Sequence, residues 1–135
     1  IIIISALLLL SCQEKPSESS DSGGFDEFES FYEIFHQDSL FQLEHIIFPL
    51  QGMPTSIGDN PEDISNFKWQ KSDWLMHRPI DPDGEFKQVL TPIDEALIIE
   101  KIVHQSGSYA MERRFAKLGD DWYLIYYAGL NRMVK

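Results

Sequence analysis

Residues 109–127 read YAMERRFAKLGDDWYLIYY, and this stretch decides the fold class. Apolar and polar side chains alternate before Leu118 in the pattern of a half-buried strand, and a second run of strand-forming residues starts at Trp122. The segment 118–121 between them supplies a turn, so the stretch predicts a β-hairpin. Both faces of the second strand are apolar, so we expect other elements to cover it on each side.

A helix is predicted before the strands, because aromatic side chains recur there at helical spacing. This stripe consists of Phe25, Phe28, Phe31, Tyr32 and Phe35. Acidic residues fill the opposite face, which indicates an amphipathic helix with one side in the core. A second, short helix is predicted over residues 38–44, followed by a strand over 46–48 that we expect Pro49 to end.

The rest of the chain is predicted to add strands that loops connect. Residues 51–65 contain two glycines and two prolines and form a long loop. Short strands are expected at 67–69, 86–90 and 96–103, and a turn is expected at 81–85. Helices first and strands afterwards indicate an α+β fold. We therefore expect one domain over residues 25–135, in which N-terminal helices pack on a strongly curved antiparallel sheet.

The chain begins with an apolar run, Ile1 to Leu10, that is too short to span a bilayer. The run ends in Leu9-Leu10-Ser11-Cys12, which resembles a bacterial lipobox. We therefore expect residues 1–11 to be the end of a signal peptide whose start precedes Ile1, and Cys12 to carry the lipid that anchors the protein. An ordinary buried helix with an incidental cysteine is the alternative. Residues 12–24 are rich in serine and glycine and are predicted to form a flexible tether.

The composition excludes several classes of partner. Twenty-two acidic against 11 basic residues give a net charge of −11, which disfavours nucleic acids because their binders need a basic face. The same charge disfavours attraction to an anionic membrane, so contact with a membrane is expected only through lipid on Cys12. A single cysteine rules out an intrachain disulfide. No motif indicates a cofactor or a metal site, and none is expected.

Several segments match landmarks of a known family. They are FYEIF (31–35), DSLFQL (38–43), IIFPL (46–50), Trp69, Trp74 and GDDWYL (119–124). On these residues the chain resembles a family of Bacteroides-type lipoproteins, domain of unknown function 4348, over about residues 25–130. The resemblance implies a nuclear transport factor 2-like (cystatin-like) cone, in which a bent sheet and the first helices enclose a pocket. It implies no activity.

Candidate site residues are mainly aromatic, and no catalytic set is visible. The residues expected to line a pocket are Trp69, Trp74, Tyr109, Phe115, Trp122 and Tyr126. Aromatic residues fill cores more often than they bind ligands, so core packing is the alternative for this group. The four histidines lack the spacing of a helical zinc site and are interpreted as surface or capping residues. Glu112-Arg113-Arg114 is interpreted as a solvated face with cross-strand pairs, and a contact with an anionic ligand or partner is the alternative.

Three functions are compatible with these features. The leading hypothesis is an uncharacterised lipid-anchored lipoprotein of the bacterial cell envelope that acts as a non-catalytic module for an unknown small ligand or envelope protein. Gln13 rather than aspartate follows Cys12, which favours the outer membrane. The second hypothesis is a small-molecule enzyme that uses the cone pocket. The third is a structural subunit of an envelope assembly, for example a homodimer formed through the sheet face.

Overall fold

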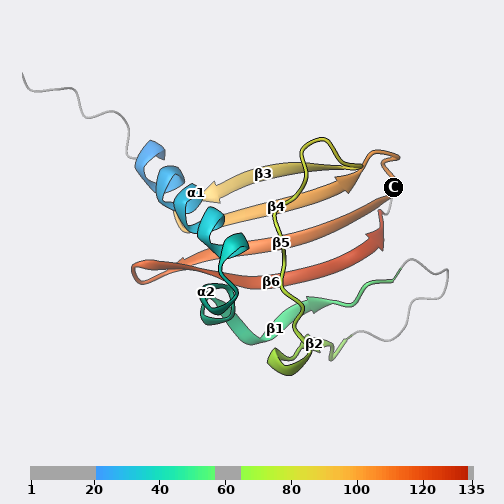
Figure 1. The fold of residues 1–135 in the computed structure, drawn as a ribbon, viewed down its shortest axis with the longest axis horizontal. Coiled ribbons are helices and arrows are strands. Elements are labelled where there is room, and N and C mark those ends of the chain that lie inside the picture. The colour runs from blue at the N-terminus through green and yellow to red at the C-terminus, as the bar shows by residue number, and fades with distance from the viewer. Residues whose placement is uncertain (1–20, 57–64, 134–135) are drawn as a thin grey trace, which may run out of the picture.

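The computed structural model describes residues 21–56 and 65–133, and their side chains from Gly24 onward. Figure 1 shows the N-terminal helices in front of a curved sheet. The elements are α1 (Asp21–Gln37), α2 (Ser39–Glu44), β1 (Ile46–Met53), β2 (Lys68–Trp69), the 3-10 helix η1 (Lys71–Asp73), β3 (Phe86–Asp94), β4 (Leu97–His104), β5 (Tyr109–Leu118) and β6 (Asp121–Arg132). The predicted signal-peptide end, Cys12 and most of the tether lie outside the described residues. No helix within the described ranges is long and apolar enough to cross a membrane.

The strands form one six-stranded sheet in the order β2-β1-β6-β5-β4-β3. Neighbouring strands are antiparallel except for β1 and β6, which run parallel. The predicted α+β class is confirmed, and the sheet is mixed rather than wholly antiparallel. β1 and β6 are neighbours in the sheet although four strands lie between them in the sequence. The chain therefore reaches the edge of β1 again only with its last strand, which runs parallel to β1.

Both helices pack on the same face of the sheet, which we call the inner face (Figure 1). The aromatic stripe of α1 supplies the core there, because Phe28, Phe31 and Phe35 are buried against Phe115 of β5. Asp38 begins α2 by accepting hydrogen bonds at Oδ1 from the first two helical N–H groups. The predicted helices and their buried face are confirmed.

The first strand is longer than its sequence indicates. β1 continues through Pro49 to Met53, so the prediction that Pro49 ends the strand is wrong. The pairing of β1 with β6 jumps from Ile46 to Gln51, which leaves Pro49 in an irregular stretch where no partner strand needs its missing N–H.

The predicted hairpin is β5 and β6. Leu118 pairs with Asp121, and Gly119 takes a φ of 69° in the two-residue turn between them. A bulge between Arg114 and Phe115 shifts the register, so Phe115 pairs with Leu124 but Arg114 pairs with Tyr126. This shift places Tyr126 on the outer face and Tyr127 on the inner face, the reverse of simple alternation.

No described helix covers the outer face of the sheet (Figure 1). The expectation that other elements cover β6 on both sides is therefore wrong for the described part of the chain. Long polar side chains shield this face in part, because the Arg114 guanidinium lies 4.0 Å from the centre of the Tyr126 ring.

Residues 74–85 form a segment that crosses the inner face between η1 and β3 (Figure 1). The buried amide of Gln42 holds its start: Oε1 accepts from Trp74 Nε1 (3.0 Å) and from the His77 N–H (2.8 Å), and Nε2 donates to the His77 carbonyl (2.9 Å). A tight turn follows, in which Asp81 accepts from the backbone of Asp83 and Gly84. The predicted turn at 81–85 is confirmed, and the segment delivers His77 to the middle of the sheet.

Candidate functional site

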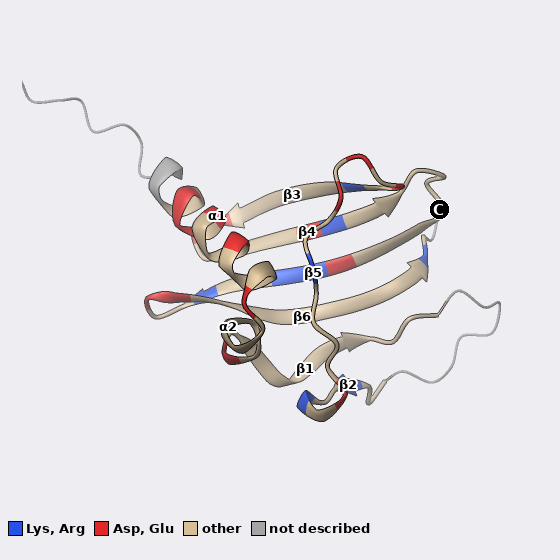
Figure 2. Cartoon of the chain, in the orientation of Figure 1, with Lys and Arg blue, Asp and Glu red and all other residues tan. Residues whose placement is uncertain are grey.

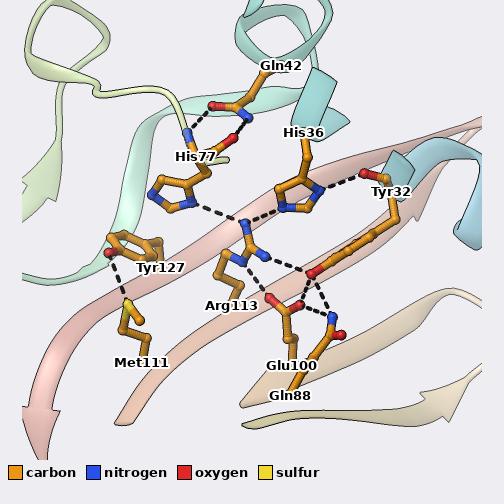
Figure 3. A network of polar contacts seen from close by, with 9 residues as sticks. All are labelled: Tyr32, His36, Gln42, His77, Gln88, Glu100, Met111, Arg113 and Tyr127. Carbon is orange, nitrogen blue, oxygen red and sulfur yellow. Dashed lines mark hydrogen bonds and ion pairs between the residues drawn. The ribbon is translucent and has the colours of Figure 1, made fainter. Parts of the chain in front are cut away.

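The candidate site is a polar network on the inner face of the sheet, shown in Figure 3. The register places Leu90, Glu100, Arg113 and Tyr127 side by side on β3 to β6. Glu100 and Arg113 are therefore direct cross-strand neighbours, and both point into the core beneath α1.

The centre of the network is a buried ion pair. Arg113 Nε donates to Glu100 Oε1 at 2.5 Å, and the two side chains are 2% and 0% exposed. The second carboxylate oxygen accepts hydrogen bonds from the Tyr32 hydroxyl and from Gln88 Nε2 (2.6 Å). These bonds compensate part of the cost of removing two charges from water.

Two histidines complete the shell around the guanidinium. His36 Nδ1 lies 2.7 Å from the Tyr32 carbonyl, which only accepts, so this nitrogen carries the proton and His36 Nε2 accepts from Arg113 Nη1 at 3.0 Å. Arg113 Nη1 also donates to His77 Nδ1 at 3.1 Å, and Nη2 donates to the Tyr32 hydroxyl at 3.0 Å. Both histidines are therefore neutral acceptors facing a fixed positive charge.

The network shifts the pKa values of its residues so that Glu100 stays charged and the two histidines stay neutral. Burial, and then the charge of Arg113, lower the pKa of His36 to about 4 and of His77 to about 3. Burial alone raises the pKa of Glu100. The charge of Arg113 and the hydrogen bonds from Arg113, Tyr32 and Gln88 outweigh burial and hold that pKa below its ordinary value. Burial raises the pKa of Tyr32 well above its ordinary value, so its hydroxyl stays a donor.

Acidification is expected to destabilise the protein between pH 7 and pH 5. His36 binds a proton at its ordinary pKa of 6.5 when unfolded but only near pH 4 when folded, so the stability from its neutral form is complete above pH 6.5 and is lost as the pH falls toward 4. His36 alone lowers the free energy of unfolding by on the order of 2 kcal/mol at pH 5. Urea unfolding at pH 7, 6 and 5 measures this loss.

The control for this prediction uses two histidine variants. His36→Asn removes one of the two buried histidines and should remove about half of the pH dependence, because His77 still titrates, whereas His104→Asn, outside the network, should keep all of it. Equal stability of the unsubstituted protein at pH 7 and pH 5 would show that burial and the charge of Arg113 do not hold His36 neutral.

Comparison with solved structures identifies the fold. A cystatin-like protein from Bacteroides caccae superposes with a TM-score of 0.57 at 18% identity, over 76% of this chain and 74% of the other. A nuclear transport factor 2-like protein from Bacteroides fragilis superposes with a TM-score of 0.51 at 15% identity, over 85% of this chain and 48% of the other, so this chain spans about half of that structure. The chain has a nuclear transport factor 2-like fold. No family model and no curated protein sequence matches it.

The nuclear transport factor 2-like cone brings together only some of the aromatic residues that we expected to line a pocket. Trp69 and Trp74 meet beside Tyr127, and Trp69 Nε1 donates to the Tyr127 carbonyl at 2.8 Å. Phe115 lies in the core under α1 and Trp122 lies farther along the same face, 5.1 Å from the Phe28 ring.

The other two predicted pocket residues lie elsewhere. Tyr109 lies at the far end of β5, where its ring is 6.4 Å from that of His104. Tyr126 projects from the outer face because of the bulge in the β5–β6 register. Core packing, the alternative for this group, describes Phe115, which is fully buried.

Two interpretations of the polar residues are wrong. His36 is 2% exposed rather than a surface residue, because it sits on the aromatic face of α1, four residues after Tyr32. Arg113 is not on a solvated face: Glu112 and Arg114 pair with each other on the outer side, and Arg113 points inward between them.

The sequence held a signal for both ends of the ion pair. Arg113 lies between Met111 and Phe115 in the phase of inward residues, and Glu100 interrupts the apolar run 97–103 at an inward position. Nothing local indicates that His77 reaches this pair from a turn-rich segment. Within residues 21–56 and 65–133, no group of three His, Cys, Asp or Glu side chains is placed to hold a metal ion.

Proposed function

We propose that the chain is a lipid-anchored envelope protein whose cone serves as a non-catalytic binding module. The observation that carries this proposal is that the polar groups of the network are hydrogen-bonded to one another. The guanidinium of Arg113, the carboxylate of Glu100 and the acceptor nitrogen of His36 are all engaged with one another, so these groups are committed to the fold. A catalytic group must instead have an atom available to the reacting molecule.

A small-molecule enzyme is the second candidate. The lowered pKa values of His36 and His77 favour it, because such shifts gather at active sites. Structural ion-pair networks shift pKa values in the same way, and the internal pairing of Arg113 supports that interpretation.

The outer face of the sheet supports binding to a second copy of the chain. Register places Ile99, Arg114 and Tyr126 in one cross-strand row, and Val89, Lys101 and Glu112 in the next. Val89 is 51% exposed, and this face carries both signs of charge beside apolar side chains. A two-fold interface needs such a self-complementary surface, because both subunits use the same patch and a basic residue of one copy can lie against an acidic residue of the other. We propose that this face forms a homodimer.

The anchor and the family rest on the sequence. The lipobox ending in Cys12 supports attachment through lipid, and Gln13 after it supports the outer membrane. Resemblance in residues 31–50 and 119–124 supports the lipoprotein family of unknown function, which is a finer assignment than the fold. Both are part of the proposal.

Replacement of Cys12 by serine tests the anchor. We expect the unsubstituted protein, expressed with a complete signal peptide in a bacterium, to take up labelled palmitate and to sediment with membranes. The Cys12→Ser protein should take up no label and remain in the soluble fraction. Cys12→Ser protein that still sediments wholly with membranes would contradict the lipid anchor. Self-association of the soluble protein, measured by sedimentation equilibrium, tests the binding half of the proposal.

A further inference from the structure

A groove of about 990 Å³ lies away from the polar network, at the end of the molecule where α1 begins. Three segments border it: the start of α1, the turn between β3 and β4, and the turn between β5 and β6. Its lining includes Phe25, Pro92, Ile98 and Trp122, which make an apolar floor. Neither the proposed dimer face nor the ion pair of Glu100 and Arg113 contributes to it.

The rim of this groove is acidic. Glu27, Asp94 and Glu95 lie in its lining, and Lys117 is the basic residue among the lining side chains. Lys117 is already paired, since its Nζ lies 2.8 Å from Glu27 Oε2. Figure 2 shows red acidic positions on α1 after its grey start and on the β5–β6 turn at this end. A groove with this rim attracts positive charge and repels anionic partners.

The floor contains an unused hydrogen-bond donor. Trp122 is 4% exposed, and its Nε1 is buried without a hydrogen-bond partner among the described residues. This N–H is closed off from solvent, so it belongs to the packed base beneath the groove and is not a contact for a ligand. A volume near the upper end of the range for small-molecule pockets suits a short stretch of chain.

We propose that this groove binds a short peptide segment of a partner protein, in which lysine or arginine flanks an apolar side chain. The apolar side chain packs on Trp122 and Ile98, and the basic side chains pair with Asp94 and Glu95 at the rim. This site is independent of the proposed dimer face, so either can fail without the other.

A peptide selection tests the proposal. A random heptapeptide display library is selected on the full-length Cys12→Ser protein, and the selected peptides are synthesised. We expect them to combine lysine or arginine with leucine, isoleucine or phenylalanine. In ¹⁵N-labelled protein they should shift the indole N–H signal of Trp122, assigned with Trp122→Phe, and leave the signals of Trp69 and Trp74 unchanged.

Charge reversal at the rim supplies the matched control. Glu95→Lys is expected to weaken binding of the selected peptide about tenfold, because it replaces an attraction with a repulsion. Glu44→Lys makes the same charge change on an exposed residue at the end of α2 and should leave the affinity unchanged. The proposal is overturned by a selection that yields no binding peptide, by peptides without basic residues, or by binding that moves Trp69 or Trp74 instead.

Discussion

Replacing Arg113 by methionine is expected to lower the free energy of unfolding by about 3–5 kcal/mol. The substitution keeps most of the side-chain volume but leaves the Glu100 carboxylate, which is 0% exposed, without its cation. It also removes the donor that His36 and His77 share. Urea unfolding at pH 7, on the full-length Cys12→Ser protein, measures the change.

Two further variants identify the cause of this loss. Arg114→Met changes the neighbouring arginine, whose ion pair with Glu112 lies at the surface, and should cost no more than about 1 kcal/mol. The double variant Glu100→Leu, Arg113→Met removes both charges and should be more stable than Arg113→Met alone. A double variant that is less stable than the single one would show that the unpaired carboxylate is not the source of the loss.

The second large effect is expected from Phe115→Ala, with a loss of about 3–5 kcal/mol in the free energy of unfolding. The Phe115 ring is fully buried, and ring centres of Phe28, Phe35 and Phe31 lie 5.4, 5.6 and 6.0 Å from it. Its removal leaves a cavity where α1 meets the sheet. Chemical unfolding at neutral pH measures the loss.

Leu75→Ala is the control for the core prediction. Leu75 is 83% exposed on the segment that crosses the inner face, so its truncation should change stability by no more than about 0.5 kcal/mol. A loss from Phe115→Ala that is no larger than that from Leu75→Ala would contradict the placement of Phe115 at the helix–sheet contact.

The elements with strong local patterns were predictable from the sequence. The aromatic side chains of α1 recur at helical spacing, and this pattern predicts an amphipathic helix with one buried face. Gly119 fits the tight turn of the last hairpin, where its φ is 69°. The strand through Pro49 was not predictable, because proline is tolerated there only through an irregularity in the pairing with β6.

The candidate site was predictable in part. Alternation in β5 places Arg113 on the same face as Phe115, so the sequence pattern alone predicts that Arg113 points inward. The register that sets Glu100 beside it depends on pairing between strands, and the position of Tyr126 depends on a bulge. The arrival of His77 depends on how Gln42 holds a segment 35 residues away in the sequence, which no local pattern encodes.

The measurement that tests the central claim most directly is sedimentation equilibrium of the Cys12→Ser protein. We propose that the outer face binds a second copy of the chain and that the inner network stabilises the fold. We expect a reversible dimer that Ile99→Lys, at the centre of the outer face, weakens at least about tenfold by placing a cation beside Arg114. Leu75→Lys, off this face, and the folded double variant Glu100→Leu, Arg113→Met should dimerise like the parent. A parent that stays monomeric at every concentration, or a dimer that the inner-face double variant disrupts and Ile99→Lys does not, would contradict the account.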